Sequence, residues 1–218
     1  HGMVGSTLGP LFRHAVETGK RARTDTAIGR GIASVGQAAV ALATEQLGGL
    51  DGRTVLVLGA GEMAEGTVKS LAAAGTSDIF VANRTWDNAV ALAEACGGTA
   101  VNLDAVGDAL VAVDMLVTTT GAQQLILESG EIAGFLSRRN GRELVIVDVA
   151  VPRDVDPRAG ELPGVTLLDM DDIGVFVEQQ MATRTRVVGN VETIVGEEVD
   201  RYRTVTSCLL YTSDAADE

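Results

Sequence analysis

Short apolar runs alternate with amphipathic stretches through the middle of the chain, from Thr54 to Asp169. Runs that are almost continuously apolar are typical of strands buried on both faces of a parallel sheet, and the stretches between them have the spacing of helices. The alternation predicts an α/β domain, a doubly wound parallel sheet with helices on both faces. We expect strands at 54–58, 78–82, 99–102, 115–119, 144–149 and 165–168, and helices at 62–74, 86–96, 104–111 and 131–139.

Helical patterns flank this domain on both sides. Residues 7–19 and 34–47 predict helices separated by a polar segment at 20–30, and residues 171–202 form one pattern with a spaced apolar stripe. A helix of about thirty residues exceeds the roughly 8–20 residues common in globular proteins. It is typical of a spine between domains or a dimer contact, with a plain helix packed on the sheet as the alternative. Residues 204–218 lack stripe and motif, so we expect a foreign or misread end without function.

The composition is that of a soluble globular protein. Lys and Arg number 17 against 30 Asp and Glu, a formal net charge of −13, and 46% of the residues are hydrophobic. This balance argues against nucleic-acid binding through bulk charge, although it allows a local basic patch. No stretch reaches the roughly 20 apolar residues of a membrane helix. Cys96 and Cys208 are too few for a disulfide framework or a four-ligand zinc site, so we expect no metal and a reducing, cytoplasmic location.

The first predicted strand runs into a glycine-rich turn, Gly59-Ala60-Gly61-Glu62-Met63-Ala64, that opens a helix. This spacing suits a dinucleotide: Gly59 permits the tight turn, Gly61 lets a pyrophosphate approach the backbone, and the small Ala64 lets the helix pack close to the strand. Free amides at the start of the helix then face the phosphates. The predicted strand before and helix after favour a Rossmann-like dinucleotide site over an ordinary strand-to-helix turn.

The second predicted strand ends at Asn83-Arg84-Thr85. A domain that binds NAD usually places a carboxylate there, about 20 residues beyond the glycines, to bind the ribose 2′-hydroxyl. A carboxylate would repel a 2′-phosphate, whereas guanidinium, amide and hydroxyl donors hold it with charge-assisted hydrogen bonds. The segment therefore favours NADPH as the cofactor. The alternative is that Arg84 points to solvent while Asn83 and Thr85 cap the next helix.

The fourth and fifth predicted strands end at the same edge of the sheet. Thr119, Thr120 and Gly121 lie at the end of the fourth strand, where small residues would let the nicotinamide half of the cofactor lie against the backbone. Strand-forming threonines followed by a turn glycine are the alternative. Asp148 and the run 149–154 lie at the end of the fifth strand, where they would either close the cofactor cleft or simply end the strand at a proline.

No catalytic group stands out in the sequence. We predict His14 to be a surface histidine and Cys96 to be a packed thiol, because no basic group close in sequence would stabilise a thiolate. His1 lies at the terminus. The pattern therefore predicts a cofactor domain whose chemical partner lies elsewhere.

Several segments, taken in order, resemble glutamyl-tRNA reductase. They are the basic segment 19–26, residues 33–35, the glycine turn 59–63, Asn83-Arg84-Thr85, the run 147–157, and residues 161–165 and 171–173. The glycine turn is shared with many dehydrogenases, but the basic segment and the Ala-Val-Pro-Arg-Asp run are narrower signals. The resemblance extends from about Val4 to Arg203.

The resemblance implies NADPH-dependent reduction of glutamyl-tRNA to glutamate 1-semialdehyde, the first committed step of tetrapyrrole synthesis by the five-carbon route. In this family a catalytic cysteine displaces the tRNA, and the resulting thioester accepts hydride more readily than an ester. The resemblance also implies a V-shaped homodimer arrayed along a spinal helix, with glutamyl-tRNA and glutamate-1-semialdehyde aminomutase as partners.

On the same basis we expect four segments. They are the end of a catalytic domain (1–48), an NADP-binding domain (49–169), part of the spinal helix (170–203) and an unmatched end (204–218). The family's nucleophilic cysteine and essential histidine would precede residue 1, and the dimerisation domain would follow Arg203. We therefore expect the isolated chain to bind NADPH without turnover.

Lys20, Arg21 and Arg23 have two interpretations. Facing the active-site cleft or tRNA, they would supply the local basic cluster that an acidic tRNA enzyme needs. As a solvated helix end, they would complement the helix dipole. Ser34 would likewise either touch the cleft or cap the helix that follows it.

Two other functions remain open. A shikimate-dehydrogenase-like NADP oxidoreductase shares the glycine turn and the Asn-Arg-Thr element, and its catalytic Lys and Asp would lie in a preceding domain. A non-catalytic NADP(H)-binding module is the second. The basic segment 19–26 and the run 149–157 favour the reductase.

Overall fold

The structure is a computed structural model that describes residues 8–26 and 34–214, without the side chains of 183–186 and 205–214. The chain divides into two compact units, and each is described by itself. The sheet unit ends at Val177 and contains the described residues from Ser34 onward. The helical unit contains the other described residues.

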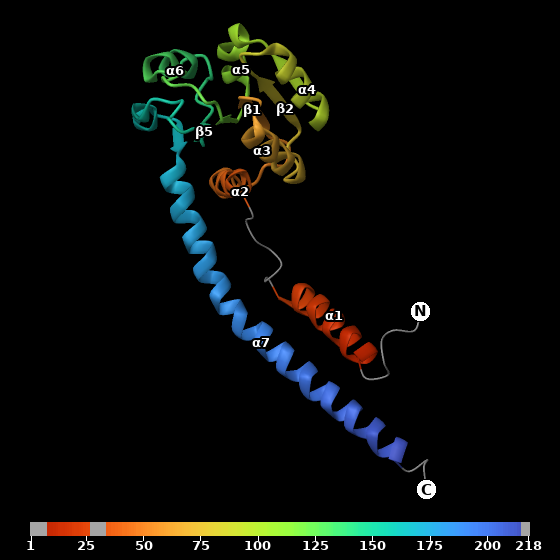
Figure 1. Ribbon diagram of the computed structural model, residues 1–218. Coiled ribbons are helices and arrows are strands. Elements are labelled where there is room, and N and C mark those ends of the chain that lie inside the picture. The colour runs from red at the N-terminus through yellow and green to blue at the C-terminus, as the bar shows by residue number, and fades with distance from the viewer. Residues whose placement is uncertain (1–7, 27–33, 215–218) are drawn as a thin grey trace. The chain divides into compact units, whose positions relative to one another are not determined.

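The sheet unit is built on six parallel strands in the order β3-β2-β1-β4-β5-β6 (Figure 1). The strands are β1 (Thr54–Leu58), β2 (Asp78–Ala82), β3 (Thr99–Val101), β4 (Met115–Thr118), β5 (Leu144–Asp148) and β6 (Val165–Leu168). The prediction of a doubly wound parallel sheet is confirmed. Each predicted strand is present, and β3, β4 and β5 end one residue earlier than expected.

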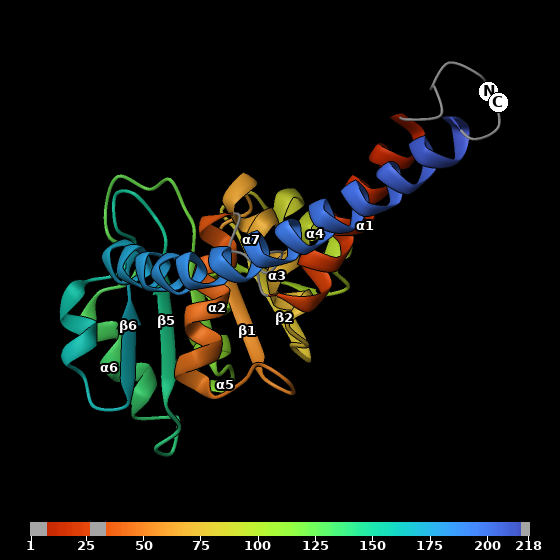
Figure 2. The same ribbon diagram turned by 90° about the horizontal axis from the view of Figure 1, so that it is seen from below.

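Helices cover both faces of this sheet. One face carries α2 (Val35–Leu47), α3 (Glu62–Ala73), α4 (Trp86–Cys96) and the start of α7 (Met170–Asp214), and the other carries α5 (Val106–Ala112), α6 (Ser129–Leu136) and the 3-10 helix η3 (Pro157–Glu161). Side chains alternate between the two layers: Val55 and Val57 pack under α2 and α3, whereas Leu56 and Leu58 pack under α5 and α6. Figure 2 shows α2 over the sheet, where it contacts β5. The core is therefore aliphatic, as the composition requires.

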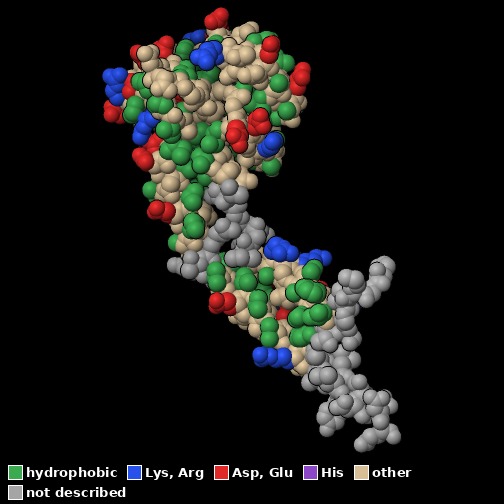
Figure 3. Space-filling view, viewed as in Figure 1, with side chains coloured by type: hydrophobic (Ala, Val, Ile, Leu, Met, Phe, Trp, Pro, Cys, Tyr) green, Lys and Arg blue, Asp and Glu red, His purple; other side chains and the backbone are tan. Residues whose placement is uncertain are grey.

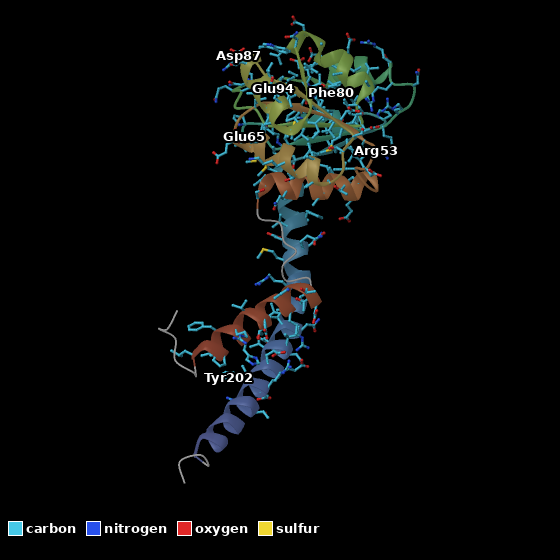
Figure 4. All side chains as sticks on the ribbon, turned by 90° about the vertical axis from the view of Figure 1, so that its right-hand side faces the viewer. Arg53, Glu65, Phe80, Asp87, Glu94 and Tyr202 are labelled. Carbon is cyan, nitrogen blue, oxygen red and sulfur yellow. The ribbon has the colours of Figure 1, made fainter. Side chains whose placement is uncertain are left out.

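The strand register brings the carboxyl ends of four strands to one edge of the sheet. Leu58 of β1 aligns with Ala82 of β2 and with Thr118 of β4, and Thr118 aligns with Asp148 of β5. The strand order reverses between β1 and β4, and open α/β sheets bind ligands outside the carboxyl ends at such a switch point. In Figure 4, Arg53, which precedes β1, lies on the opposite side of the sheet unit from Glu65 in the first turn of α3. The switch point lies on the side of Glu65.

Two helices of the sheet unit differ from their predicted bounds by more than one residue. The predicted helix at 104–111 is divided into a 3-10 turn, η2 (Leu103–Ala105), and α5. The predicted helix at 131–139 begins earlier and ends earlier, as α6. It begins earlier because Glu128 and Glu131 form a capping box, in which the Glu131 carboxylate accepts from the Glu128 N–H at 3.1 Å.

Ser34 caps α2, as one of its two interpretations predicted. Its hydroxyl oxygen accepts a hydrogen bond from the Gln37 N–H at 3.2 Å. This satisfies one of the free amides at the start of the helix.

The helical unit consists of α1 (Leu8–Asp25) and the part of α7 beyond Val177. The prediction that a polar segment at 20–30 separates two helices is wrong for residues 20–25, which are helical. Arg21 pairs with Asp25 one turn later, so charges at this spacing support the helix rather than mark a loop. The long helix also differs from its predicted end at 202, since the backbone stays helical to Asp214.

Polar contacts join the two helices of this unit. The Arg21 guanidinium lies 2.8 Å from a Glu197 oxygen and 3.0 Å from a Glu198 oxygen. His14 meets the Tyr202 ring edge-on at 5.6 Å between centroids, and its Nδ1 lies 3.7 Å from Glu198 Oε2. Figure 4 shows Tyr202 on α7 beside α1. The prediction of a surface histidine is therefore confirmed only in part, because the side chain stays 21% exposed while the paired helix covers the rest of the ring.

Neither interpretation of the basic segment included these contacts. Arg21 is a link between helices, whereas Lys20 and Arg23 stay exposed on α1. Some predicted features lie outside the described residues: His1, the helix start at Thr7, residues 27–30 and 215–218, Ala33 and the Cys208 side chain. Among the helices that the structure describes, none combines the length and the apolar character needed to span a membrane.

Candidate functional site

A tight turn after β1 brings the glycine motif to the switch point. Gly59 has a φ of +118°, and a Cβ atom built on it would overlap the Thr119 side chain. The Gly59 N–H donates to the Ala82 carbonyl oxygen at 2.8 Å, which ties the turn to the end of β2. Only glycine accommodates both the positive φ and the close approach of Thr119.

The second glycine leaves the start of α3 open. Gly61 is the N-cap and supplies no side-chain bond to the helix, and no atom lies within 4 Å of a Cβ built on it. The first-turn amides, which belong to Glu62 and Met63 among others, therefore lack a side-chain acceptor from the cap residue. Ala64 is fully buried, which lets α3 pack closely on β1. Such a helix start, with free amides and the positive end of the helix dipole, suits a phosphate.

The loop after β2 carries the predicted 2′-phosphate ligands. Asn83 Nδ2 donates to the Thr85 carbonyl oxygen at 3.0 Å, which folds the loop on itself. Thr85 is the N-cap of α4 but makes no side-chain capping bond. Arg84 is exposed, and within the described part of the chain no ion pair is recorded for it. The side chain of Thr85 therefore does not cap α4, whereas the exposed Arg84 agrees both with a solvent-facing side chain and with one available to a ligand.

The loop after β4 has its hydroxyl groups committed to the protein. The Thr119 N–H and hydroxyl both donate to the Leu58 carbonyl oxygen, at 2.9 and 3.3 Å. The Thr120 hydroxyl donates to Asp154 at 2.6 Å and accepts from the Ala122 N–H at 3.2 Å. This loop can therefore offer a ligand its main chain and its small size rather than its hydroxyl groups.

Two buried carboxylates lie behind this loop. Asp148 accepts the Thr118 hydroxyl at 2.8 Å and three main-chain amides from the segment 150–155. Asp154 accepts the Thr120 N–H at 2.9 Å in addition to the hydroxyl. Burial raises the pKa of the Asp154 carboxyl, the hydrogen bonds from Thr120 lower it, and the neighbouring Asp148 raises it, with a net pKa above the usual value. The run predicted to close the cleft thus braces the loop after β4.

These loops surround a cavity of about 530 Å³. It is lined by Leu58, Gly59, Ala60, Gly61, Asn83, Arg84, Thr85, Asn88, Leu103, Thr119, Thr120, Gly121, Ala122 and Ile126. The predicted site residues from all three loops meet here. Glu62, Met63 and Ala64, which form the first turn of α3, are not among the lining residues. The volume lies within the roughly 300–1,000 Å³ of small-molecule and cofactor sites.

Five lining residues were not among the predicted site residues: Leu58 and Ala122, which adjoin predicted ones, and Asn88, Leu103 and Ile126. Asn88 lies one helical turn after Arg84, so the predicted helix 86–96 carried a signal for it. Leu103 and Ile126 reach the cavity through long-range packing, for which the sequence offers no comparable signal.

Cys96 lies apart from this cavity. It lines a second cavity of about 310 Å³ between α3 and α4, and its Sγ donates to the Ala93 carbonyl oxygen at 3.3 Å. This agrees with the predicted packed thiol. Among the side chains that the structure describes, no group of three or more His, Cys, Asp and Glu is placed to hold a metal ion.

The surface of the sheet unit carries both signs of charge. Figure 3 shows Lys and Arg side chains interspersed with Asp and Glu over its visible face. Anion binding in a chain of net charge −13 therefore depends on local groups. The start of α3 and Arg84 are such groups.

Comparison with known proteins places these features in context. Residues 41–175 match the family model described as shikimate / quinate 5-dehydrogenase. The glutamyl-tRNA reductase of Pelotomaculum thermopropionicum is 42% identical over 195 residues, which cover 89% of this chain and 44% of that protein. The structure of glutamyl-tRNA reductase from Methanopyrus kandleri aligns with a TM-score of 0.85 and 36% identity, over 95% of this chain and 52% of that one.

A second solved structure supports the fold alone. The nucleotide binding domain of glutamyl-tRNA reductase from Thermoplasma volcanium is 17% identical, with a TM-score of 0.53 over 71% of this chain and 99% of that one. The chain spans less than half the length of the first curated relatives that it matches.

Proposed function

We propose that the sheet unit of this chain binds NADPH for the reduction of glutamyl-tRNA to glutamate 1-semialdehyde. The premise is that the chain belongs to the shikimate / quinate 5-dehydrogenase family and is a relative of glutamyl-tRNA reductase. In this proposal the chain supplies the NADP(H)-binding part of the enzyme. The reaction is the first step of tetrapyrrole synthesis by the five-carbon route.

One observation carries the choice of cofactor. At the end of β2, where an NAD domain places a carboxylate, the cavity wall presents the exposed Arg84 guanidinium between Asn83 and Thr85. A guanidinium binds phosphate through charge-assisted, often bidentate hydrogen bonds. This supports NADPH rather than NADH.

The residues of the cavity fit a dinucleotide phosphate. Space in front of Gly61 and the free amides of α3 suit the pyrophosphate, and the loop at Arg84 suits the 2′-phosphate. The main chain of residues 119–122 would support the nicotinamide half. The bound cofactor would supply the hydride, and these residues bind and orient it. Cys96 does not line this cavity, so we expect cofactor binding without turnover from these 218 residues.

The wider role in the enzyme is also a proposal. Glutamyl-tRNA would be the substrate, a second copy would form the homodimer, and glutamate-1-semialdehyde aminomutase would receive the product, in the cytoplasm. The proposed division is an end of the catalytic domain at 1–48, the NADP-binding domain at 49–169 and a spinal helix at 170–203, with 204–218 unmatched.

Titration of both cofactors into the purified chain tests the proposal. By calorimetry we expect NADPH to bind at least about tenfold more tightly than NADH, a difference of about 1.4 kcal/mol. Equal affinities would contradict the choice of NADPH, and the absence of binding by either cofactor would contradict the site. With glutamyl-tRNA added, we expect no oxidation of NADPH by the isolated chain.

The family match over residues 41–175 favours a second candidate, a shikimate-dehydrogenase-like NADP oxidoreductase. It uses the same cavity with a different substrate. Oxidation of shikimate with NADP⁺ by a longer protein that contains this sequence would favour this candidate, whereas reduction of glutamyl-tRNA by such a protein would exclude it.

A further inference from the structure

Asp154 lies directly behind the part of the cavity wall that follows β4. Its side chain is fully buried, and its recorded partners in the described chain are hydrogen-bond donors of Thr120 rather than a Lys or Arg side chain. A buried carboxylate without a cation is unfavourable unless hydrogen bonds replace its lost solvation. The hydrogen bonds of Asp154 show which part of the chain this buried carboxylate holds in place.

Asp154 holds both ends of one wall segment. Its carboxylate accepts the Thr120 N–H at 2.9 Å and the Thr120 hydroxyl at 2.6 Å. Its carbonyl oxygen accepts the N–H groups of Ile126 at 2.7 Å and Leu127 at 3.1 Å. Thr120 and Ile126 both line the cavity. A single residue therefore sets where the segment leaves the sheet and where it returns.

The position of Asp154 is itself set by the edge of the sheet. Its N–H donates to Asp148 Oδ2 at 3.0 Å, and Asp148 also accepts the Thr118 hydroxyl at 2.8 Å. Thr118 and Asp148 are aligned neighbours at the ends of β4 and β5. The chain of contacts thus runs from two central strands to the loop, without a solvent-exposed link.

We propose that Asp154 is a positioning residue that fixes residues 119–122 in the conformation that receives the nicotinamide half of the cofactor. This rests on the proposed function, which supplies the ligand. The Thr120 hydroxyl is committed to Asp154, so the residue acts through the loop main chain and does not touch the cofactor. Loss of the carboxylate should therefore weaken binding of the nicotinamide half. The adenosine half, next to Arg84, should bind as before.

The variant Asp154→Asn tests this, because its NH₂ group cannot accept from Thr120. Calorimetric titration of the whole chain should show the Kd for NADPH rising about tenfold, while the Kd for 2′,5′-ADP, which lacks the nicotinamide half, changes less than about twofold. Asp156→Asn is the matched control: it lies in the same run, is buried, bonds Ser129 and Arg158, and does not line the cavity. It should leave both affinities unchanged. Equal weakening of both ligands by Asp154→Asn, or no weakening, overturns the proposal.

Hydrogen exchange separates this inference from the proposed function. If the unmodified chain binds neither ligand, the proposed function fails, and exchange at the Thr120 and Ala122 amides still tests the bracing role. Exchange at least about tenfold faster in Asp154→Asn but not in Asp156→Asn supports it, since exchange reports local opening. Unchanged exchange overturns it.

Thr120→Val is the second variant, for use if Asp154→Asn does not fold. It removes one hydrogen-bond donor and keeps the carboxylate. The same selective loss of NADPH affinity is expected, and its absence overturns the proposal.

Discussion

Two loops leave the same edge of the sheet and use their polar groups in opposite ways. The loop after β2 leaves the Arg84 guanidinium without a recorded ion pair in the described chain and the Thr85 hydroxyl without a capping bond. The loop after β4 commits the hydroxyl groups of Thr119 and Thr120 to the Leu58 carbonyl and to Asp154. We call the loop after β2 the open loop, because these two polar groups are available to a charged ligand group. We call the loop after β4 the braced loop, because its hydrogen bonds fix its position, which suits placement of a reactive group.

Reversal of charge in the open loop should give the largest effect. Arg84→Glu places a carboxylate where the proposed 2′-phosphate binds, so we expect the Kd for NADPH to rise about 100-fold, equivalent to about 2.8 kcal/mol. The Kd for NADH should change less than about threefold, because NADH lacks this phosphate. Calorimetry with both cofactors measures the two values.

Arg13→Glu is the control for net charge, since Arg13 is exposed on α1 in the helical unit. It makes the same change in charge and should alter neither affinity. If Arg84→Glu weakened NADPH and NADH equally, the open loop would not be the part that recognises the phosphate, and the contrast between the loops would fail.

The two glycines separate stability from binding. Gly59→Ala forces a side chain to a φ of +118° and into Thr119 of the braced loop, so we expect the free energy of unfolding to fall by about 2 kcal/mol. Gly61→Ala meets open space, so its stability should fall by less than about 1 kcal/mol. Its methyl group lies where the pyrophosphate would approach, so NADPH should bind about tenfold more weakly. Urea unfolding and calorimetry measure the two effects.

The opposite ranking would revise the geometry of the turn. If Gly61→Ala bound NADPH normally, the pyrophosphate would not approach the backbone at this point. If Gly59→Ala kept full stability, the loop after β4 would be less firmly placed than its hydrogen bonds indicate.

The fold was largely predictable because each strand is a short apolar run with its own helix beside it. The same holds for the loop after β2, where residue types such as Arg84 directly indicate the proposed binding of a phosphate. The resemblance to glutamyl-tRNA reductase, first seen in these motifs, is confirmed by the matched relatives.

What the sequence did not reveal depends on contacts between distant residues. Asp154 stands 34 positions from Thr120, and nothing in the local pattern relates them. Likewise, the pairing of Arg21 with Glu197 and Glu198 gives a function to charges that the sequence left as a cleft-facing or solvated cluster. Leu103 and Ile126 line the cavity only because the chain folds back.

The braced loop should also show a pH dependence that sharpens the contrast, with the smallest effect of the series. Burial raises the pKa of Asp154, hydrogen bonds from Thr120 lower it and Asp148 raises it, leaving the pKa above 3.8. When the pKa of an acid is higher in the folded state, the folded state binds more protons between the two values. The stabilising contribution is then present below 3.8 and is lost as the pH rises through the raised pKa.

Asp169 provides the opposite sign in the same unit. Burial raises the pKa of Asp169, but the amides of Asp172 and Asp171 and the charge of Arg153, 2.7 Å away, lower it below 3.8 overall. Its contribution is present above 3.8 and is lost as the pH falls through the lowered pKa. From about pH 3.5 to pH 7, the loss of unfolding free energy caused by Asp154→Asn should therefore shrink, whereas that caused by Asp169→Asn should grow. Urea unfolding at the two pH values measures both. If both losses changed in the same direction with pH, the pKa of the Asp154 carboxyl would not be raised in the folded state. The loop after β4 would then be held in place by other contacts.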